Sequence, residues 1–189
     1  MGAVVSIGIL IALVFGFRVC GDSGPHSSGN PDYPAKYDLQ TFEDQGRDHV
    51  AAGTVVDTYN SNPPTSGPHG PLVQILPGQN WGVSPVPAAK ESAVHNMEHG
   101  GVVVWYNCDG GPAPLEADSC EILEDQLSEI VLARVNAGMF ILMTPYEEME
   151  NRIALTAWRN LDTFDEFDGV RIEAFIASFE CRFDPEGFC

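Results

Sequence analysis

Residues 95–106 read HNMEHGGVVVWY, and this stretch decides the fold because one element ends in it and another begins. Residues 101–106, GVVVWY, are mostly β-branched or aromatic, which predicts a strand. The segment before it favours a helix, because it contains Ala, Lys and Glu and has no proline between Pro87 and Gly100. Gly100 is suited to ending that helix. We therefore expect a helix that leads directly into a strand.

The chain beyond this strand alternates between helical and extended patterns. Apolar residues at helical spacing predict helices over 119–135 and 170–180, and MFILMT (139–144) and RIALTAW (152–158) predict two strands. The helical faces consist of Leu123, Leu127, Ile130 and Val131 in the first helix, and of Ile172, Phe175, Ile176 and Phe179 in the second. This order predicts a single α+β domain with a mixed sheet and two amphipathic helices on one face.

Working toward the N-terminus, GTVVDTY (53–59) and LVQIL (72–76) are candidates for short strands. Between them lies SNPPTSGPHGP (61–71), in which the prolines and glycines exclude both a helix and a regular ladder. We place the α+β domain at residues 48–189. Residues 20–47 are rich in Gly, Pro, Ser and Asp, which is typical of a flexible tether.

The first nineteen residues are expected to be a membrane anchor or a signal segment. Met1–Phe17 contains no charged side chain, and as an apolar helix it would be about 25 Å long, near the short limit for a membrane span. We expect residues 1–17 to anchor the chain in the cell membrane with the domain outside the cytoplasm. Two alternatives stay open, namely secretion after cleavage of a signal and attachment of a lipid at Cys20.

The charge of the chain is strongly negative. The 189 residues carry 27 Asp and Glu against 9 Lys and Arg, which gives a formal net charge of -18. Because such a surface repels phosphate backbones, nucleic acid is excluded as a partner. The charge is compatible with cations as ligands but identifies none of them.

Four cysteines lie in two local pairs. Cys108 and Cys120 bracket a loop rich in Gly and Pro, and Cys181 and Cys189 bracket CRFDPEGFC. Of the three possible pairings, the two local disulfides are the easiest to close. Neither pair has the C-x-x-C spacing of a redox or zinc motif. Disulfides would place the domain in an oxidising compartment.

Histidines carry the chemistry that the sequence suggests. On a helix, His95 and His99 in the H-x-x-E-H string lie four residues apart on one face, so both imidazoles could reach one metal ion. His69 lies in a loop stiffened by prolines, which suits a third ligand. We expect His69, His95 and His99 to bind copper or zinc, with His49 or Glu98 completing the site.

Two other interpretations use the same residues. The H-x-x-E-H string matches the motif of certain zinc peptidases, so Glu98 could activate a metal-bound water in a metal-dependent hydrolase. Alternatively, the histidines are internal hydrogen-bond partners in a structural or interaction domain that has no catalytic role. The sequence leaves open whether the protein is an enzyme. Binding of copper or zinc does not require catalysis.

Three motifs in order, PPTSGPH (63–69), HNMEHGGVVVWY (95–106) and IALTAW (153–158), resemble the family catalogued as domain of unknown function 3105. The resemblance extends over residues 48–185 and implies an anchored or exported protein with no established activity. His49, His69, His95, Glu98 and His99 fall within or beside the family's patterns. This sequence departs from the family at Trp158-Arg159, where a glycine commonly follows the Trp, and both cysteine pairs are additions to the family pattern.

Overall fold

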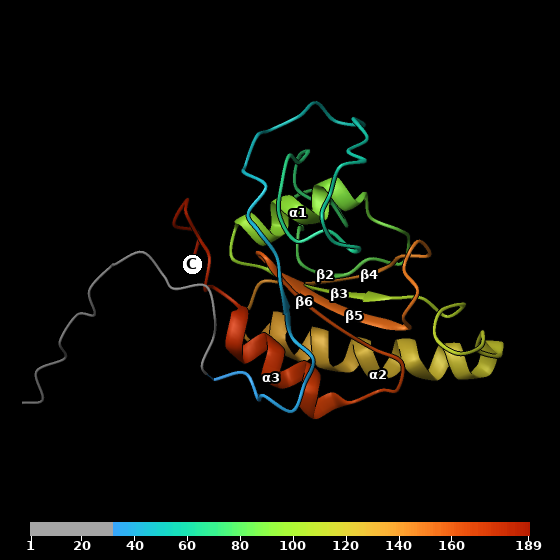
Figure 1. Cartoon of the computed structure of the whole chain (residues 1–189). Coiled ribbons are helices and arrows are strands. Elements are labelled where there is room, and N and C mark those ends of the chain that lie inside the picture. Colours follow the sequence, from blue (N-terminus) through green and yellow to red (C-terminus); the bar gives the residue numbers. More distant parts are fainter. Residues whose placement is uncertain (1–31) are drawn as a thin grey trace, which may run out of the picture.

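The computed structural model describes residues 32–189 (Figure 1). The predicted apolar helix at the N-terminus, the anchor or signal segment and Cys20 lie outside the described residues. Among residues 32–189, no helix combines the length and the apolar character that a membrane span requires.

Within this part of the chain, six strands form one mixed sheet in the order β1-β6-β5-β3-β4-β2. The central strand β3 pairs in parallel with β4 and antiparallel with β5. β2 is parallel to β4, whereas β6 is antiparallel to both β5 and β1. The strands are β1 (Gln40–Thr41), β2 (Gly82–Val83), β3 (Val102–Tyr106), β4 (Ile141–Pro145), β5 (Ile153–Ala157) and β6 (Asn160–Phe164).

The helices lie on opposite faces of the sheet (Figure 1). α2 (Ala117–Asn136) and α3 (Gly169–Phe179) cover one face, and α1 (Lys90–Glu98) lies with the long loops on the other. Because side chains alternate along a strand, β3 sends Val102 and Val104 toward α2 and α3 and sends Val103 and Trp105 toward α1. The predicted α+β class is therefore confirmed, and α2 and α3 are the two amphipathic helices that share a face.

The predictions for the first half of the domain are less accurate. Residues 53–59 and 72–76 are irregular rather than extended, because other groups satisfy their backbone N–H groups. Glu91 Oε1 accepts from the Val56 N–H at 2.9 Å, and Asn96 Oδ1 accepts from the Val73 N–H at 3.1 Å. Strand β6 has no sequence prediction, because NLDTF carries polar residues where a strand pattern needs apolar ones.

Part of the predicted tether packs against the domain. Tyr33 is only 6% exposed, and its ring contacts Phe175 edge-on at 5.6 Å. Its hydroxyl donates to the buried carboxylate of Asp162, which also pairs with Arg171. Strand β1 then adds to the edge of the sheet. The aromatic residues at the end of the Gly- and Pro-rich stretch supply this packing, so the folded unit begins before residue 48.

Both local disulfides are present, as predicted. Cys108–Cys120 links the end of β3 to the first turn of α2, and Cys181–Cys189 closes a loop that follows α3. This C-terminal loop, residues 181–189, lies near the end of α1 because the Cys181 N–H donates to the Gly100 carbonyl at 2.8 Å.

Candidate metal centre

The end of α1 positions three of the candidate residues. His95 and Glu98 lie three residues apart in the last turn, and His99 is the residue that caps the helix. Beyond it, Gly100 adopts a φ of +83° and donates to the Met97 carbonyl, while the Gly101 N–H donates to the Asn96 carbonyl. These two bonds form a Schellman motif, which stops the helix at the residue that the sequence predicts.

A short parallel bridge brings His49 and His69 together from separate loops. The His69 N–H donates to the Asp48 carbonyl at 2.9 Å, and the Val50 N–H donates to the His69 carbonyl at 2.8 Å. The loop of His69 is held further by the Tyr59 hydroxyl, which donates to the Pro68 carbonyl at 2.6 Å. Backbone and side-chain bonds therefore fix this loop in addition to its prolines.

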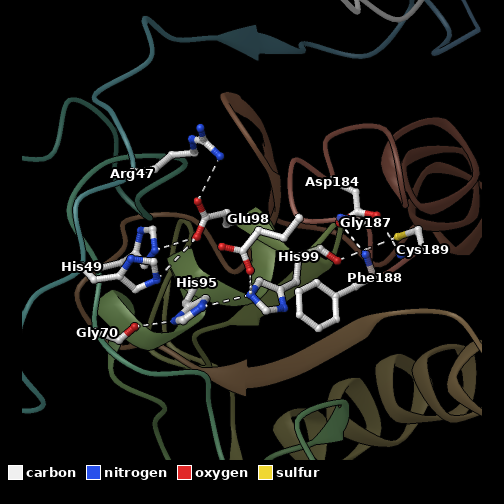
Figure 2. Close-up of polar contacts among 12 residues, drawn as sticks. Arg47, His49, Gly70, His95, Glu98, His99, Asp184, Gly187, Phe188 and Cys189 are labelled. Atoms are coloured by element: carbon white, nitrogen blue, oxygen red, sulfur yellow. Dashed lines mark hydrogen bonds and ion pairs between the residues drawn. The ribbon is translucent and has the colours of Figure 1, made fainter. Parts of the chain in front are cut away.

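These elements gather four side chains at one place (Figure 2). His49, His69, His95 and Glu98 each offer a ligand atom, and these atoms all lie within 4.8 Å of one another. The ring centroids of His69 and His95 are 4.8 Å apart, and those of His49 and His69 are 4.7 Å apart. We call this group the four-residue cluster.

Within the cluster, His69 and Glu98 face each other in a way that a hydrogen bond does not explain. His69 Nδ1 lies 2.8 Å from the Gly67 carbonyl, which can only accept, so Nδ1 carries the proton of the neutral ring. His69 Nε2 then presents a lone pair 2.9 Å from Glu98 Oε2. Across residues 32–189 neither atom finds a hydrogen-bond partner, although the two side chains are 0% and 2% exposed.

His95 is oriented in the same manner. Its Nδ1 lies 2.6 Å from the Gly70 carbonyl, so in the neutral ring Nε2 carries the lone pair. Burial lowers the pKa of His95; the Gly70 bond opposes that shift, and the neighbouring imidazoles reinforce it. The ring therefore favours the neutral form, which is the form that binds a metal.

His99 lies beside this cluster rather than in it. Its Nε2 is 3.0 Å from His95 Nε2 and 3.3 Å from an oxygen of Glu186, in the C-terminal loop (Figure 2 shows the His95 contact). Burial lowers the pKa of His99, although the carboxylates of Glu186, Glu98 and Asp184 oppose that shift. With Glu98 and Glu186, His99 forms a second group of ligand atoms within 4.8 Å.

The structure therefore brings all five predicted residues to one region but divides them differently from the prediction. The sequence emphasises the pair His95 and His99, whereas the four-residue cluster uses His95 with Glu98. Sequence reasoning misses Glu186, because an acidic residue in a loop 87 positions after His99 gives no signal. It also misses Arg47, whose guanidinium lies 3.6 Å from Glu98 Oε1, because this residue falls in the predicted tether.

A third group of potential ligands is excluded by its chemistry. Cys108, Cys120 and Glu124 offer ligand atoms within 4.8 Å of one another. Both sulfurs belong to the disulfide, and a metal requires the free thiolate. The candidate centre is therefore at the end of α1.

Comparisons with known proteins identify the family of the chain and give no information on this arrangement. The family described as "Protein of unknown function (DUF3105)" matches residues 49–187, from the first histidine of the cluster to the C-terminal loop. No curated protein and no solved structure gives a significant match. Because the family matches most of the chain, the protein belongs to the DUF3105 family of proteins of unknown function.

Proposed function

We propose that this protein binds a transition metal ion, zinc or copper, through His49, His69, His95 and Glu98. The observation that carries the proposal is the buried pair His69 and Glu98, in which a nitrogen lone pair faces a carboxylate oxygen at 2.9 Å with no hydrogen bond between them. Leaving buried polar atoms without partners costs about 1–3 kcal/mol each. A cation held between them removes that cost.

The donor set supports a borderline-soft ion. Imidazole nitrogens with one carboxylate suit zinc or copper, whereas calcium and magnesium require more oxygen ligands. In a tetrahedral zinc site with bonds of about 2.0–2.1 Å, ligand atoms lie about 3.4 Å apart. The distances from Glu98 Oε2 to His69 Nε2 and His49 Nε2, 2.9 Å and 3.8 Å, bracket that value.

The hydrogen bonds behind the ligands also support metal binding. Metal-bound histidines usually donate their other ring N–H to a carbonyl or carboxylate, which fixes the ring and raises its basicity. His69 and His95 both have this arrangement, with the carbonyls of Gly67 and Gly70. A purely structural histidine would need a hydrogen bond at Nε2 as well, and within residues 32–189 His69 Nε2 makes none, although Glu98 Oε2 lies 2.9 Å away.

We further propose that the domain works outside the cytoplasm, tethered to the cell membrane through residues 1–17. The two disulfides support an oxidising compartment. Secretion after cleavage remains the alternative. A domain in that compartment would encounter metal ions before they enter the cell.

The position of Glu98 favours binding over hydrolysis. In the hydrolase interpretation Glu98 is a base that activates a water, and its carboxylate must then stand apart from the metal ligands. Here its carboxylate lies against His69, as a ligand would.

The test is metal content and affinity of the full-length protein, purified in mild detergent and stripped with chelator. We expect tight binding of zinc or copper(II) by calorimetry and elemental analysis, and loss of most affinity in His69→Ala and His95→Ala. His26→Ala is the matched control, because it removes a histidine that is not among the proposed ligands.

The result also separates the interpretations. If the histidines are only structural, the alanine variants lower the melting temperature equally with and without metal, and no binding heat appears. That outcome would overturn the proposal. If Glu98→Gln keeps the metal but abolishes a hydrolytic activity, the hydrolase interpretation replaces it.

A further inference from the structure

The group of Glu98, His99 and Glu186 remains after the four-residue cluster is assigned. Each offers a ligand atom within 4.8 Å of the other two, and both Glu98 and His99 are buried. Glu98 belongs to both groups, so one carboxylate lies between two sets of donors. The imidazoles of His95 and His99, one from each set, meet Nε2 to Nε2 at 3.0 Å.

The C-terminal loop holds Glu186 in place beside His99. The ring of Phe188 stacks on the His99 ring with centroids 4.0 Å apart. The Asp184 carboxylate accepts from the backbone N–H groups of Gly187, Phe188 and Cys189 (Figure 2). The disulfide to Cys181 closes the loop. Although the Glu186 side chain is 40% exposed, the loop on both sides of it is therefore held in place, and its carboxylate lies 3.3 Å from His99 Nε2.

The charges of this region favour a second cation. Glu98 and Glu186 place two carboxylates within ligand distance of each other, and Asp184 adds a third close to His99. The Arg47 guanidinium approaches Glu98 at 3.6 Å from a half-exposed side chain, which is a weak ion pair. One metal ion in the four-residue cluster leaves Glu186 and His99 without a cation to bind.

We infer that Glu98 bridges two metal ions, the first held by His49, His69 and His95 and the second by His99 and Glu186. This inference rests on the proposed function. Two-metal sites have ions about 3.5–4 Å apart, a separation that one bridging carboxylate spans. Filling both positions requires lone pairs on both Nε2 atoms, so the single proton of neutral His99 moves from Nε2, where His95 Nε2 accepts it, to Nδ1.

The experiment counts zinc ions bound by the full-length protein and by Glu186→Gln. We expect two ions per chain in the wild type, the second weaker than the first, and one ion in Glu186→Gln with the first affinity unchanged. Glu121→Gln, an exposed change on α2, is the matched control and should keep two. His99→Ala should also bind one ion, provided that its circular dichroism matches the wild type.

Copper(II) distinguishes a bridged pair from two separate sites. Two copper(II) ions that share a carboxylate couple magnetically, so the electron paramagnetic resonance signal should grow with the first equivalent and fall short of doubling with the second. One ion per chain in the wild type, with Glu186→Gln unchanged, would overturn the second position and leave the proposed function standing. Loss of both ions in Glu186→Gln would also overturn it, and no binding at all would remove both proposals.

Discussion

Glu98 Oε2 and His69 Nε2 lie 2.9 Å apart in the interior of the domain, and within the described residues neither has a hydrogen-bond partner. Glu98→Gln should therefore separate stability from binding. The Gln amide can donate to His69 Nε2, so the metal-free protein should gain about 1 kcal/mol, or about 2–4 °C in melting temperature.

Metal affinity should change in the opposite direction, because the variant loses the anionic ligand. Thermal melts in chelator and a calorimetric zinc titration measure the two effects. A variant that is less stable without metal and binds zinc normally would show that the carboxylate has a purely structural role.

The Cys181–Cys189 disulfide should affect zinc binding at the proposed second metal position. Cys181→Ser with Cys189→Ser removes a bridge that closes a sequence separation of 8 and is worth about 2.5 kcal/mol in the chain-entropy model. We expect a lower melting temperature and loss of the second zinc ion, because Glu186 is no longer held at His99.

Cys108→Ser with Cys120→Ser is the control, since that bridge has a sequence separation of 12 and should cost about 3 kcal/mol. It should keep both ions. Equal metal loss in the two double variants would mean that general destabilisation, rather than the C-terminal loop, controls binding.

Gly100 and Gly138 both follow the end of a helix in a left-handed conformation. Replacing each with alanine distinguishes the cost of backbone strain from the cost of a steric clash. Gly138 has a φ of +90°, and a methyl group added to it would meet open space, so Gly138→Ala should cost only the left-handed conformation, about 1 kcal/mol. At Gly100 the same methyl would lie 2.6 Å from Cys189 Sγ.

Gly100→Ala should therefore destabilise the protein clearly more than Gly138→Ala and should displace the C-terminal loop. Chemical denaturation gives the free energies of unfolding, and the zinc count reports the loop. Equal costs at the two positions would show that the loop yields to the methyl without strain.

Substitution of Tyr33 tests whether the chain before residue 48 contributes to the stability of the domain. Its hydroxyl donates to the buried Asp162 carboxylate, and hydrogen bonds to charged groups contribute about 1.5–3 kcal/mol. Tyr33→Phe should lower the free energy of unfolding by that amount. Tyr37→Phe is the matched control, because the Tyr37 hydroxyl is buried and unpartnered in the described part of the chain, and its removal should cost nothing.

Stability should also fall at alkaline pH. Burial raises the pKa of Tyr106 to about 12, helped by Glu124, and burial raises the pKa values of Tyr33, Tyr59 and Tyr146 as well. The unfolded chain releases these protons near pH 10, whereas the folded chain retains them. Their contribution is therefore complete below about pH 10 and is lost as the pH rises toward the folded values.

Denaturant unfolding at successive pH values, with tyrosinate absorbance recorded in parallel, measures this loss. Tyrosine ionisation that is complete near pH 10 in the folded protein would contradict the prediction.

Most of the fold that follows residue 95 was predictable because it obeys simple periodicities, and strand β6 is the exception. β3, α2, β4, β5 and α3 each bury one continuous apolar pattern, and the Schellman turn at Gly100 follows from a glycine after a helix. The loops before α1 were not predictable. Val56 and Val73 are buried in irregular backbone, and their N–H groups donate to side chains of helix α1, namely Glu91 and Asn96. No local sequence pattern encodes such a contact.

The sequence predicted which histidines and which glutamate of α1 belong to the candidate site, but it did not predict which of them contact one another. Spacing on a helix cannot tell whether His99 or Glu98 turns toward His69, because both share a face with His95. The helix ends at Glu98, and as its cap His99 is directed to the C-terminal loop. Glu186 belongs to the site only through that loop, whose position depends on the folded domain.

The side chains of the four-residue cluster differ in solvent exposure. The His49 side chain is 54% exposed, whereas those of His69 and Glu98 are buried. In the proposed metal centre, rotation of the His49 imidazole would open the coordination sphere while the sheet and helices stay undisturbed. The residence time of a bound ion would then depend on the rotation of one ring rather than on unfolding of the domain. An acceptor with its own imidazole could replace His49 as a ligand and remove the ion by stepwise ligand exchange.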